Sequence, residues 1–208
     1  MSRPILYSFR RCPYAMRARL GLASAGLSVE LREIVLRDKA PEFLATSPSA
    51  TVPCLKAGGM VIDESLDIML WALAQSDPEQ LRDMPRLGHD LIAATDGAFK
   101  TALDRYKYHS RYGSDRDLER TKAAGHLIAL DAQLDGKPWL FGDTPRLADL
   151  AILPFIRQFA LTDKAWFDAQ PWPHLHRWLG AFLTSERFLS IMLKYPRWQA
   201  GDTATRFP

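Results

Sequence analysis

The sequence of 208 residues predicts a chain in two parts, an α/β part over residues 1–75 and an all-helical part over residues 86–208. Within the first 75 residues, short apolar runs typical of strands alternate with helical patterns. After the polar, proline-containing stretch 76–85, which is typical of a linker, no strand pattern follows. The predicted fold class is therefore α/β plus all-α, and the length suffices for two modest cores.

The first part has the element order βαβ, then a short helix, then ββα. Residues 4–8 form a short apolar run typical of a buried strand, and the helical pattern after it ends near Gly26. Alternating apolar and polar residues over 29–36 predict a second strand, parallel to the first because a helix connects them. A weak helical turn follows. The pair Gly58-Gly59 between two apolar runs indicates an antiparallel hairpin, and a further helical pattern comes after it.

Helical patterns account for the second part. Long helices are predicted over residues 86–109 and 114–136, and the strongly apolar run 147–161 predicts a central, buried helix. A further helix carries an inward stripe, and a last short helix precedes the tail 194–208, which lacks periodicity. The stripe consists of Leu175, Trp178, Leu179 and Phe182.

Charge and composition limit the classes of function. The formal net charge of +3 is spread along the chain and does not form the stripe of a nucleic-acid-binding surface. Basic pairs are expected on solvated helix faces, for example Arg17 with Arg19 and Arg116 with Arg120. No apolar run approaches the roughly 18 residues of a membrane span, and no early run suits a signal peptide. We expect a soluble, cytoplasmic protein that binds neither nucleic acid nor membrane.

The chain has two cysteines, Cys12 and Cys54, too few for a disulfide scaffold or a four-cysteine zinc site. Cys12 lies between a strand end and Pro13, at the mouth of the first predicted helix. A helix dipole lowers the pKa of such a thiol by about one unit, and first-turn amides and nearby arginines add to this. The alternative is a small buried hydrophobe, which is how we interpret Cys54.

The motifs around these residues resemble those of the glutathione transferase family. The sequence CPYA, which begins at Cys12, resembles the active-site motif of cysteine-type members, the omega class and the transferase-like glutaredoxins. Val52-Pro53 resembles the family's cis-proline loop, and Glu64-Ser65 resembles its site for the γ-glutamyl group. The resemblance implies a thioredoxin-like domain of order βαβ-α-ββα, an all-helical domain behind it, and a homodimer.

Glutathione is the co-substrate that the resemblance implies. The main chain of Val52, before the proline, would pair with its cysteinyl part. Ser65 would bind the γ-glutamyl carboxylate, Glu64 the ammonium group and Lys39 the glycyl carboxylate. Taken alone, Ser65 is equally an ordinary N-cap and Lys39 a solvated lysine.

The family's folding signature resembles FGDTPRLADLAI, whose aspartate corresponds to Asp149. The signature usually has serine or threonine three residues earlier, where this chain has Arg146. The helix therefore loses half of its capping box, and we expect Asp149 to hold the helix start with less help.

Other residues are weaker or less specific site candidates. His174 and His176 form an HxH pair without further ligands, so no metal is expected. Tyr7 corresponds to the thiol-activating tyrosine of other transferase classes, but the CPYA motif beside it favours a structural role. The electrophile pocket is expected between the two predicted domains, with the first long helix as one wall. Its candidate residues are Phe9, Tyr14, Arg105, Tyr106 and Tyr108.

The predicted function is glutathione-dependent thiol transfer through Cys12. Its thiolate attacks the glutathione sulfur of a mixed disulfide, and a second glutathione then releases oxidised glutathione. Reduction of dehydroascorbate by the same chemistry stays open. The alternatives are conventional conjugation of glutathione to apolar electrophiles, and a non-catalytic protein that binds ligands or partners.

Overall fold

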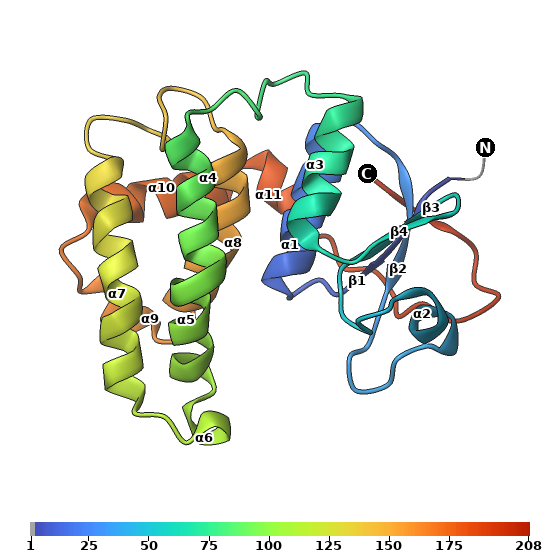
Figure 1. Ribbon diagram of the computed structural model, residues 1–208, viewed down its shortest axis with the longest axis horizontal. Helices are drawn as coiled ribbons and strands as arrows, with labels where there is room; N and C mark the ends of the chain where they lie inside the picture. The colour runs from blue at the N-terminus through green and yellow to red at the C-terminus, as the bar shows by residue number, and fades with distance from the viewer. Residues whose placement is uncertain (1–2) are drawn as a thin grey trace. The chain divides into compact units, whose positions relative to one another are not determined.

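The computed structural model describes residues 3–208, which divide into two compact units (Figure 1). Unit 1 joins the chain up to Gln80 with Ser185–Pro208, and unit 2 is Leu81–Thr184. The last helix and the tail thus belong with the sheet, whereas the sequence assigned all of 86–208 to the helical part. Met1 and Ser2 of the predicted first domain lie outside the described residues.

Unit 1 is the predicted thioredoxin-like domain, built on a mixed sheet of strand order β4-β3-β1-β2-β5, in which β5 is Thr205–Phe207 of the tail. β1 and β2 pair in parallel and are connected by α1, and β3 and β4 form the antiparallel hairpin predicted at Gly58-Gly59. Gly26 ends α1 with a φ of 67°, a conformation that favours glycine. The bounds are β1 Ile5–Ser8, α1 Pro13–Ser24, β2 Val29–Glu33, α2 Pro41–Thr46, β3 Cys54–Ala57, β4 Met60–Ile62, α3 Ser65–Gln75 and α11 Glu186–Ile191.

The tail contains a strand that the sequence did not predict. β5 (Thr205–Phe207) pairs antiparallel with β2 and covers its outer edge. Ahead of it, the Trp198 amide donates to the Glu33 carbonyl at 2.9 Å, and the Trp198 ring is buried against the sheet. Three residues are too few to show a period of two, so pairing with a distant strand decided this element.

The expectation that Arg17 and Arg19 lie on a solvated helix face is wrong. Their exposed fractions are 1% and 0%. α1 contacts α3 and α11 as well as the sheet, so most of its circumference is buried. At the α1–α3 contact, a Cβ on Gly21 would lie 2.8 Å from Met69 Cα, which shows how closely the helices approach.

Unit 2 is all-helical, as predicted, but its first long helix is interrupted. A π-helical turn over Thr95–Phe99 contains Gly97 at φ −90°, ψ −105°, outside the helical region. A short helix, α9, was not predicted, whereas the four side chains of the predicted inward stripe in α10 are buried. The bounds are α4 Arg86–Ala94, α5 Lys100–Lys107, α6 His109–Tyr112, α7 Arg116–Gln133, α8 Leu147–Ala160, α9 Lys164–Asp168 and α10 Pro173–Thr184.

Asp149 anchors the start of α8 from a fully buried position. Its carboxylate accepts hydrogen bonds from Arg146 N at 2.8 Å, Leu140 N at 3.0 Å and Trp178 Nε1 at 2.9 Å. Arginine has no acceptor, so the second half of the capping box is missing, as expected. The expectation that Asp149 holds the helix start with less help is wrong, because Leu140 and Trp178, which lie outside α8, also donate to its carboxylate. Burial nevertheless raises the pKa of Asp149 to about 6.

Candidate functional site

Cys12 lies at the N-cap of α1, where the chain turns out of β1. The turn is closed by a hydrogen bond from Cys12 N to Phe9 O at 3.0 Å. Pro13 takes the first helical position, which suits its fixed φ and its missing N–H. The half-buried sulfur lies 3.7 Å from the carbonyl oxygen of Val52 and donates to it. The fold thus brings the candidate nucleophile to the candidate glutathione loop.

The expected hydrogen bonds from the first-turn amides to the sulfur are not formed among the described residues, since the Cys12 side chain makes no capping contact with α1. A thiol is a donor and therefore turns toward an acceptor, here Val52 O. The neighbouring arginines pack on rings: the Arg11 guanidinium lies 5.5 Å from the Phe9 ring centroid, and that of Arg17 lies 5.8 Å from the Tyr14 ring centroid.

The Val52–Pro53 peptide is cis, the geometry that the resemblance implies, and both residues are buried. Cys54 follows at the start of β3 and is fully buried. Burial, together with a hydrogen bond to Asp63, raises the pKa of the Cys54 thiol to about 12. Cys54 is therefore the core residue that the sequence indicated, and Cys12 is the accessible thiol of the two.

Glu64 and Ser65 lie at the start of α3, where Glu64 and not Ser65 is the N-cap. Glu64 is the N-cap and is exposed, whereas Ser65 is the first helical residue and is buried, so the N-cap alternative for Ser65 is wrong. Ser65 Oγ lies 3.4 Å from Arg17 Nη1, which donates to it. Lys39 is half-buried in the segment after β2.

Arg17 is a candidate site residue that was not predicted from the sequence. Its guanidinium is buried beside Ser65, where the resemblance places a carboxylate. The signal that was overlooked is the apolar character of α1 on nearly every side. Such a helix has no broad polar face, so a charged residue within it is expected to be buried with a partner. The apolar side chains are Ala15, Met16, Ala18, Leu20 and Leu22.

Tyr7 has the structural surroundings expected for it. Its ring is buried in a cluster with Phe43, Val52 and Cys54, against which Phe9 and Cys12 pack. The Tyr7 hydroxyl accepts a hydrogen bond from Arg32 Nη1 at 3.0 Å, so it has a partner on the neighbouring strand.

The three candidates on α5 and just after it do not converge. The Arg105 guanidinium lies 3.8 Å from the Glu119 carboxylate. Tyr106 is buried, with its ring centroid 5.3 Å from that of Phe159. Tyr108 follows α5 and is 41% exposed. Unit 2 therefore presents these side chains to three different surroundings.

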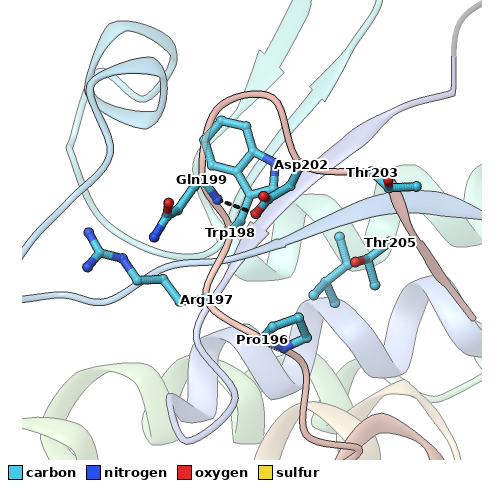
Figure 2. Close-up of a pocket in the computed structure, with 8 residues that line it drawn as sticks. Pro196, Arg197, Trp198, Gln199, Asp202, Thr203 and Thr205 are labelled. Atoms are coloured by element: carbon cyan, nitrogen blue, oxygen red, sulfur yellow. Dashed lines mark hydrogen bonds between the residues drawn. The ribbon is translucent and has the colours of Figure 1, made fainter.

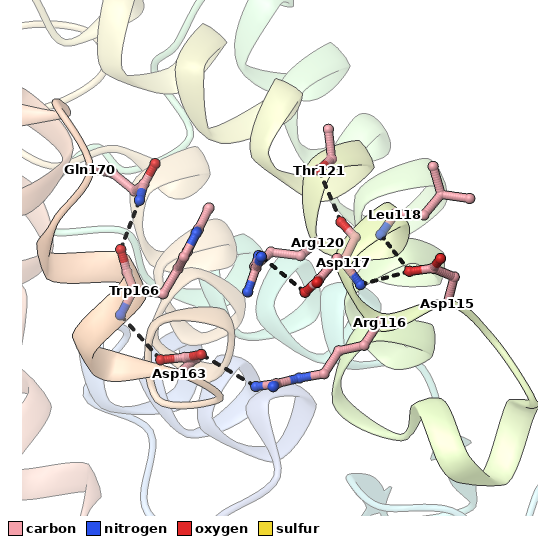
Figure 3. Close-up of polar contacts among 9 residues, drawn as sticks. All are labelled: Asp115, Arg116, Asp117, Leu118, Arg120, Thr121, Asp163, Trp166 and Gln170. Atoms are coloured by element: carbon pink, nitrogen blue, oxygen red, sulfur yellow. Dashed lines mark hydrogen bonds and ion pairs between the residues drawn. The ribbon is translucent and has the colours of Figure 1, made fainter.

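A second group lies between α7 and α9 of unit 2, where Arg116 and Arg120, expected on a solvated helix face, are half-buried against partners (Figure 3). The Arg120 guanidinium lies 4.6 Å from the Trp166 ring and 6.0 Å from that of Tyr106. Arg116 pairs with Asp163 at 3.3 Å, and Asp163 also caps α9. Within residues 3–208, the Tyr106 hydroxyl has no hydrogen-bond partner. Arginine planes stacked on aromatic rings thus organise this corner of the unit.

The larger surface hollows described for residues 3–208 lie apart from the predicted site residues of unit 1. One, of about 440 Å³, is formed by the tail around Arg197, Gln199 and Asp202 (Figure 2). The other, of about 530 Å³, lies in unit 2 and is lined by Arg105, Glu119 and other residues. Over residues 3–208, no group of three potential ligands is placed to hold a metal ion, and no helix is long and apolar enough to cross a membrane.

Comparison with known proteins assigns the family. Models of the glutathione S-transferase N-terminal and C-terminal domains match residues 6–80 and 93–181. The glutathione S-transferase-like protein LUC7 of Fusarium sp is 33% identical over 164 residues, which cover 70% of this chain and 72% of that protein. The chain belongs to the glutathione S-transferase family.

Further relatives of this family member are named either transferases or isomerases. Glutathione S-transferase U22 of Arabidopsis thaliana is 29% identical over 178 residues, covering 80% of this chain and 79% of its own. Maleylacetoacetate isomerase of Mus musculus is 27% identical over an alignment of 220 positions, which covers 97% of this chain and 96% of that protein. A crystal structure of a glutathione transferase family member from Pseudomonas fluorescens pf-5, with two glutathione bound, has the same fold. Its TM-score is 0.79 at 19% identity, over 91% of this chain and 92% of that one.

Proposed function

We propose that this family member is a glutathione-dependent thiol transferase whose nucleophile is Cys12. The observation that carries the proposal is the position of the sulfur: at the N-cap of a twelve-residue helix and 3.7 Å from Val52 O, beside the cis Val52–Pro53 peptide. A helix start favours an anion and therefore a thiolate. The relatives named transferases support the dependence on glutathione.

Glutathione would bind across the same face of unit 1. The main chain of Val52 pairs with its cysteinyl part, and Lys39 pairs with its glycyl carboxylate. Ser65 and the buried Arg17 accommodate the γ-glutamyl carboxylate, for which arginine is a suitable planar donor, while the exposed Glu64 takes the ammonium group.

The contact between Cys12 and Val52 O gives this binding a chemical consequence. In the structure the thiol donates to that carbonyl. An incoming cysteinyl N–H competes for the same acceptor, and a thiolate is repelled by it. Glutathione binding therefore favours turning the sulfur toward the first-turn amides of α1, the environment that stabilises its charge.

The proposed reaction has two disulfide exchanges. The Cys12 thiolate attacks the glutathione sulfur of a mixed disulfide, an S–S bond to Cys12 forms, and the substrate leaves as its thiolate. A second glutathione thiolate then attacks the glutathione sulfur of this adduct, which releases oxidised glutathione and regenerates the Cys12 thiolate. No other oxidant or reductant is required. Dehydroascorbate reduction is a further candidate reaction of the same thiol.

The test is the reduction of the mixed disulfide of glutathione and 2-mercaptoethanol. Cys12→Ser is expected to abolish it, because a serine hydroxyl is not ionised at neutral pH. Cys54→Ser is the matched control and is expected to retain the activity, since Cys54 is buried and its thiol pKa is about 12. Full activity of Cys12→Ser would refute the proposal.

A second candidate function is glutathione-dependent isomerisation, favoured by the match to mouse maleylacetoacetate isomerase over 97% of this chain. Conventional conjugation is the third, favoured by the relatives named transferases. Both predict that Cys12→Ser keeps the activity toward maleylacetoacetate or an apolar electrophile. Assaying the same variant with all three substrates separates the candidates. A homodimer and a second-substrate site on the helical domain stay predictions from the resemblance, and a cytoplasmic location stays a prediction from the sequence composition.

A further inference from the structure

The turn that carries Cys12 is held by a carboxylate from the neighbouring strand. Glu33 is the last residue of β2, and its side chain is 12% exposed. Its Oε1 accepts a hydrogen bond from the main-chain N–H of Arg10 at 2.6 Å. Arg10 lies in the middle of the turn that the hydrogen bond from Cys12 N to Phe9 O closes. Glu33 thus contacts the turn through its backbone, independently of the side chain at position 10.

The second oxygen of Glu33 pairs with a buried arginine. Arg19 Nη2 lies 2.6 Å from Glu33 Oε2, and Arg19 is fully buried in α1. Arg19 Nε also donates to Ser8 Oγ at 2.9 Å, and Ser8 is the last residue of β1. Arg19 therefore holds the end of β1, just before the turn. Glu33 holds the middle of the turn through Arg10 N. The turn then leads into α1, the helix that carries Arg19.

We propose that Glu33 is a positioning residue for Cys12: by accepting from Arg10 N, its carboxylate holds the turn so that the sulfur stays at the helix start beside Val52. This deepens the proposed function and rests on it. The carboxylate has two acceptor oxygens, and each has one charged or main-chain donor at 2.6 Å. An amide has only one acceptor oxygen, so with Glu33→Gln either Arg10 N or Arg19 loses its acceptor.

A purely structural role is the competing explanation, because Arg19 Nη1 also donates to the Ile191 carbonyl of α11 at 3.0 Å. In that case the ion pair only attaches α11 to the rest of unit 1. The chain offers a control for this, since Arg187 of α11 is bound to Glu79 and to Ser24. Arg187→Met loosens α11 without touching the turn.

The experiment measures Cys12 directly. The rate of its alkylation by iodoacetamide is followed by mass spectrometry at one pH, together with kcat and KM for mixed-disulfide reduction. Glu33→Gln is expected to lower the alkylation rate and kcat by about 10-fold to 100-fold, because small misplacement of a reacting group costs rates of that order. KM for glutathione is expected to stay within about twofold, since the residues that bind it are unchanged. Arg187→Met is expected to leave alkylation and kcat unchanged.

A double variant guards against misfolding. Glu33→Gln leaves a buried guanidinium without its counter-ion, so the single variant is at risk of unfolding. Combining Arg19→Met with Glu33→Gln removes that charge, and the carbonyl of the introduced amide can still accept from Arg10 N. The double variant is expected to restore most of the alkylation rate.

Three results would overturn the inference: unchanged alkylation and kcat in Glu33→Gln, an equal loss in Arg187→Met, or a double variant that folds and stays slow. Alkylation requires only the thiol, so it reports on positioning even if Cys12→Ser retains disulfide reduction. Failure of the proposed function is thereby distinguished from failure of this inference.

Discussion

Asp149→Ala tests how strongly one buried carboxylate stabilises unit 2. The substitution removes the acceptor of three N–H donors, from Leu140, Arg146 and Trp178. Leu140 and Trp178 are fully buried, and each unsatisfied buried donor costs about 1–3 kcal/mol. Removing the buried charge offsets part of this loss. We expect the free energy of unfolding to fall by about 3 kcal/mol at pH 7, a large part of the stability of an ordinary domain.

The same variant has a pH dependence whose sign follows from burial. The pKa of Asp149 is about 6 in the folded protein, against an ordinary value of 3.8 for the unfolded chain. Because the folded pKa is the higher one, this group's contribution to stability is complete below pH 3.8 and is lost as the pH rises toward 6. Wild type should therefore lose about 2 kcal/mol relative to Asp149→Ala between pH 4 and pH 7. The effect of the substitution is accordingly larger at pH 4.

The assay is urea unfolding at pH 4 and pH 7, followed by tryptophan fluorescence. Asp143→Ala, at an exposed position of the preceding loop, is the control and is expected to change the stability by less than about 0.5 kcal/mol at pH 7. An effect of Asp149→Ala that is the same at both pH values would refute the reasoning. It would mean that the three donors compensate fully for burial of the charge.

Two further predictions concern packing and a second buried group. Gly21→Ala should lower the free energy of unfolding by about 1–2 kcal/mol in urea titrations, because its Cβ would lie 2.8 Å from a backbone atom of Met69. Gly180→Ala, with open space at the Cβ, should instead stabilise by about 0.5–1 kcal/mol, and a loss there would contradict the packing argument. His126, bonded to Thr95 Oγ1 at 2.9 Å, has its pKa lowered to about 4 by burial. The stability that neutral His126 contributes is fully present above pH 6.5 and is lost as the pH falls toward 4. Over that range, the free energy of unfolding of wild type should fall by about 2 kcal/mol relative to that of His126→Gln. Parallel curves of stability against pH for the two proteins would contradict this.

Local patterns were enough to predict the parts of the site that depend on neighbouring residues. Cys12 before Pro13 at a helix start, and the Gly58-Gly59 hairpin, both follow from conformational preferences of a few residues. That Cys12 meets Val52, forty positions away, followed only from the family resemblance. The sequence pattern contains no signal for that distance.

The features that were wrongly predicted from the sequence depend on partners far away along the chain. Local sequence predicts Arg19 on the surface, whereas in the fold it is bound by Glu33, by Ser8 and by the Ile191 carbonyl, 172 positions away. β5 is too short to show a period and exists because the edge of β2 is there to pair with.

Local sequence patterns are sufficient for the two-part architecture, the helix starts and the identity of the candidate nucleophile, because hydrophobic periodicity, proline and glycine act over a few residues. Which charges are buried, which carboxylate holds the Cys12 turn and where the tail lies are specified by the assembled fold. A buried charge is tolerated only where partners from other segments satisfy it, and those partners are defined by the fold as a whole.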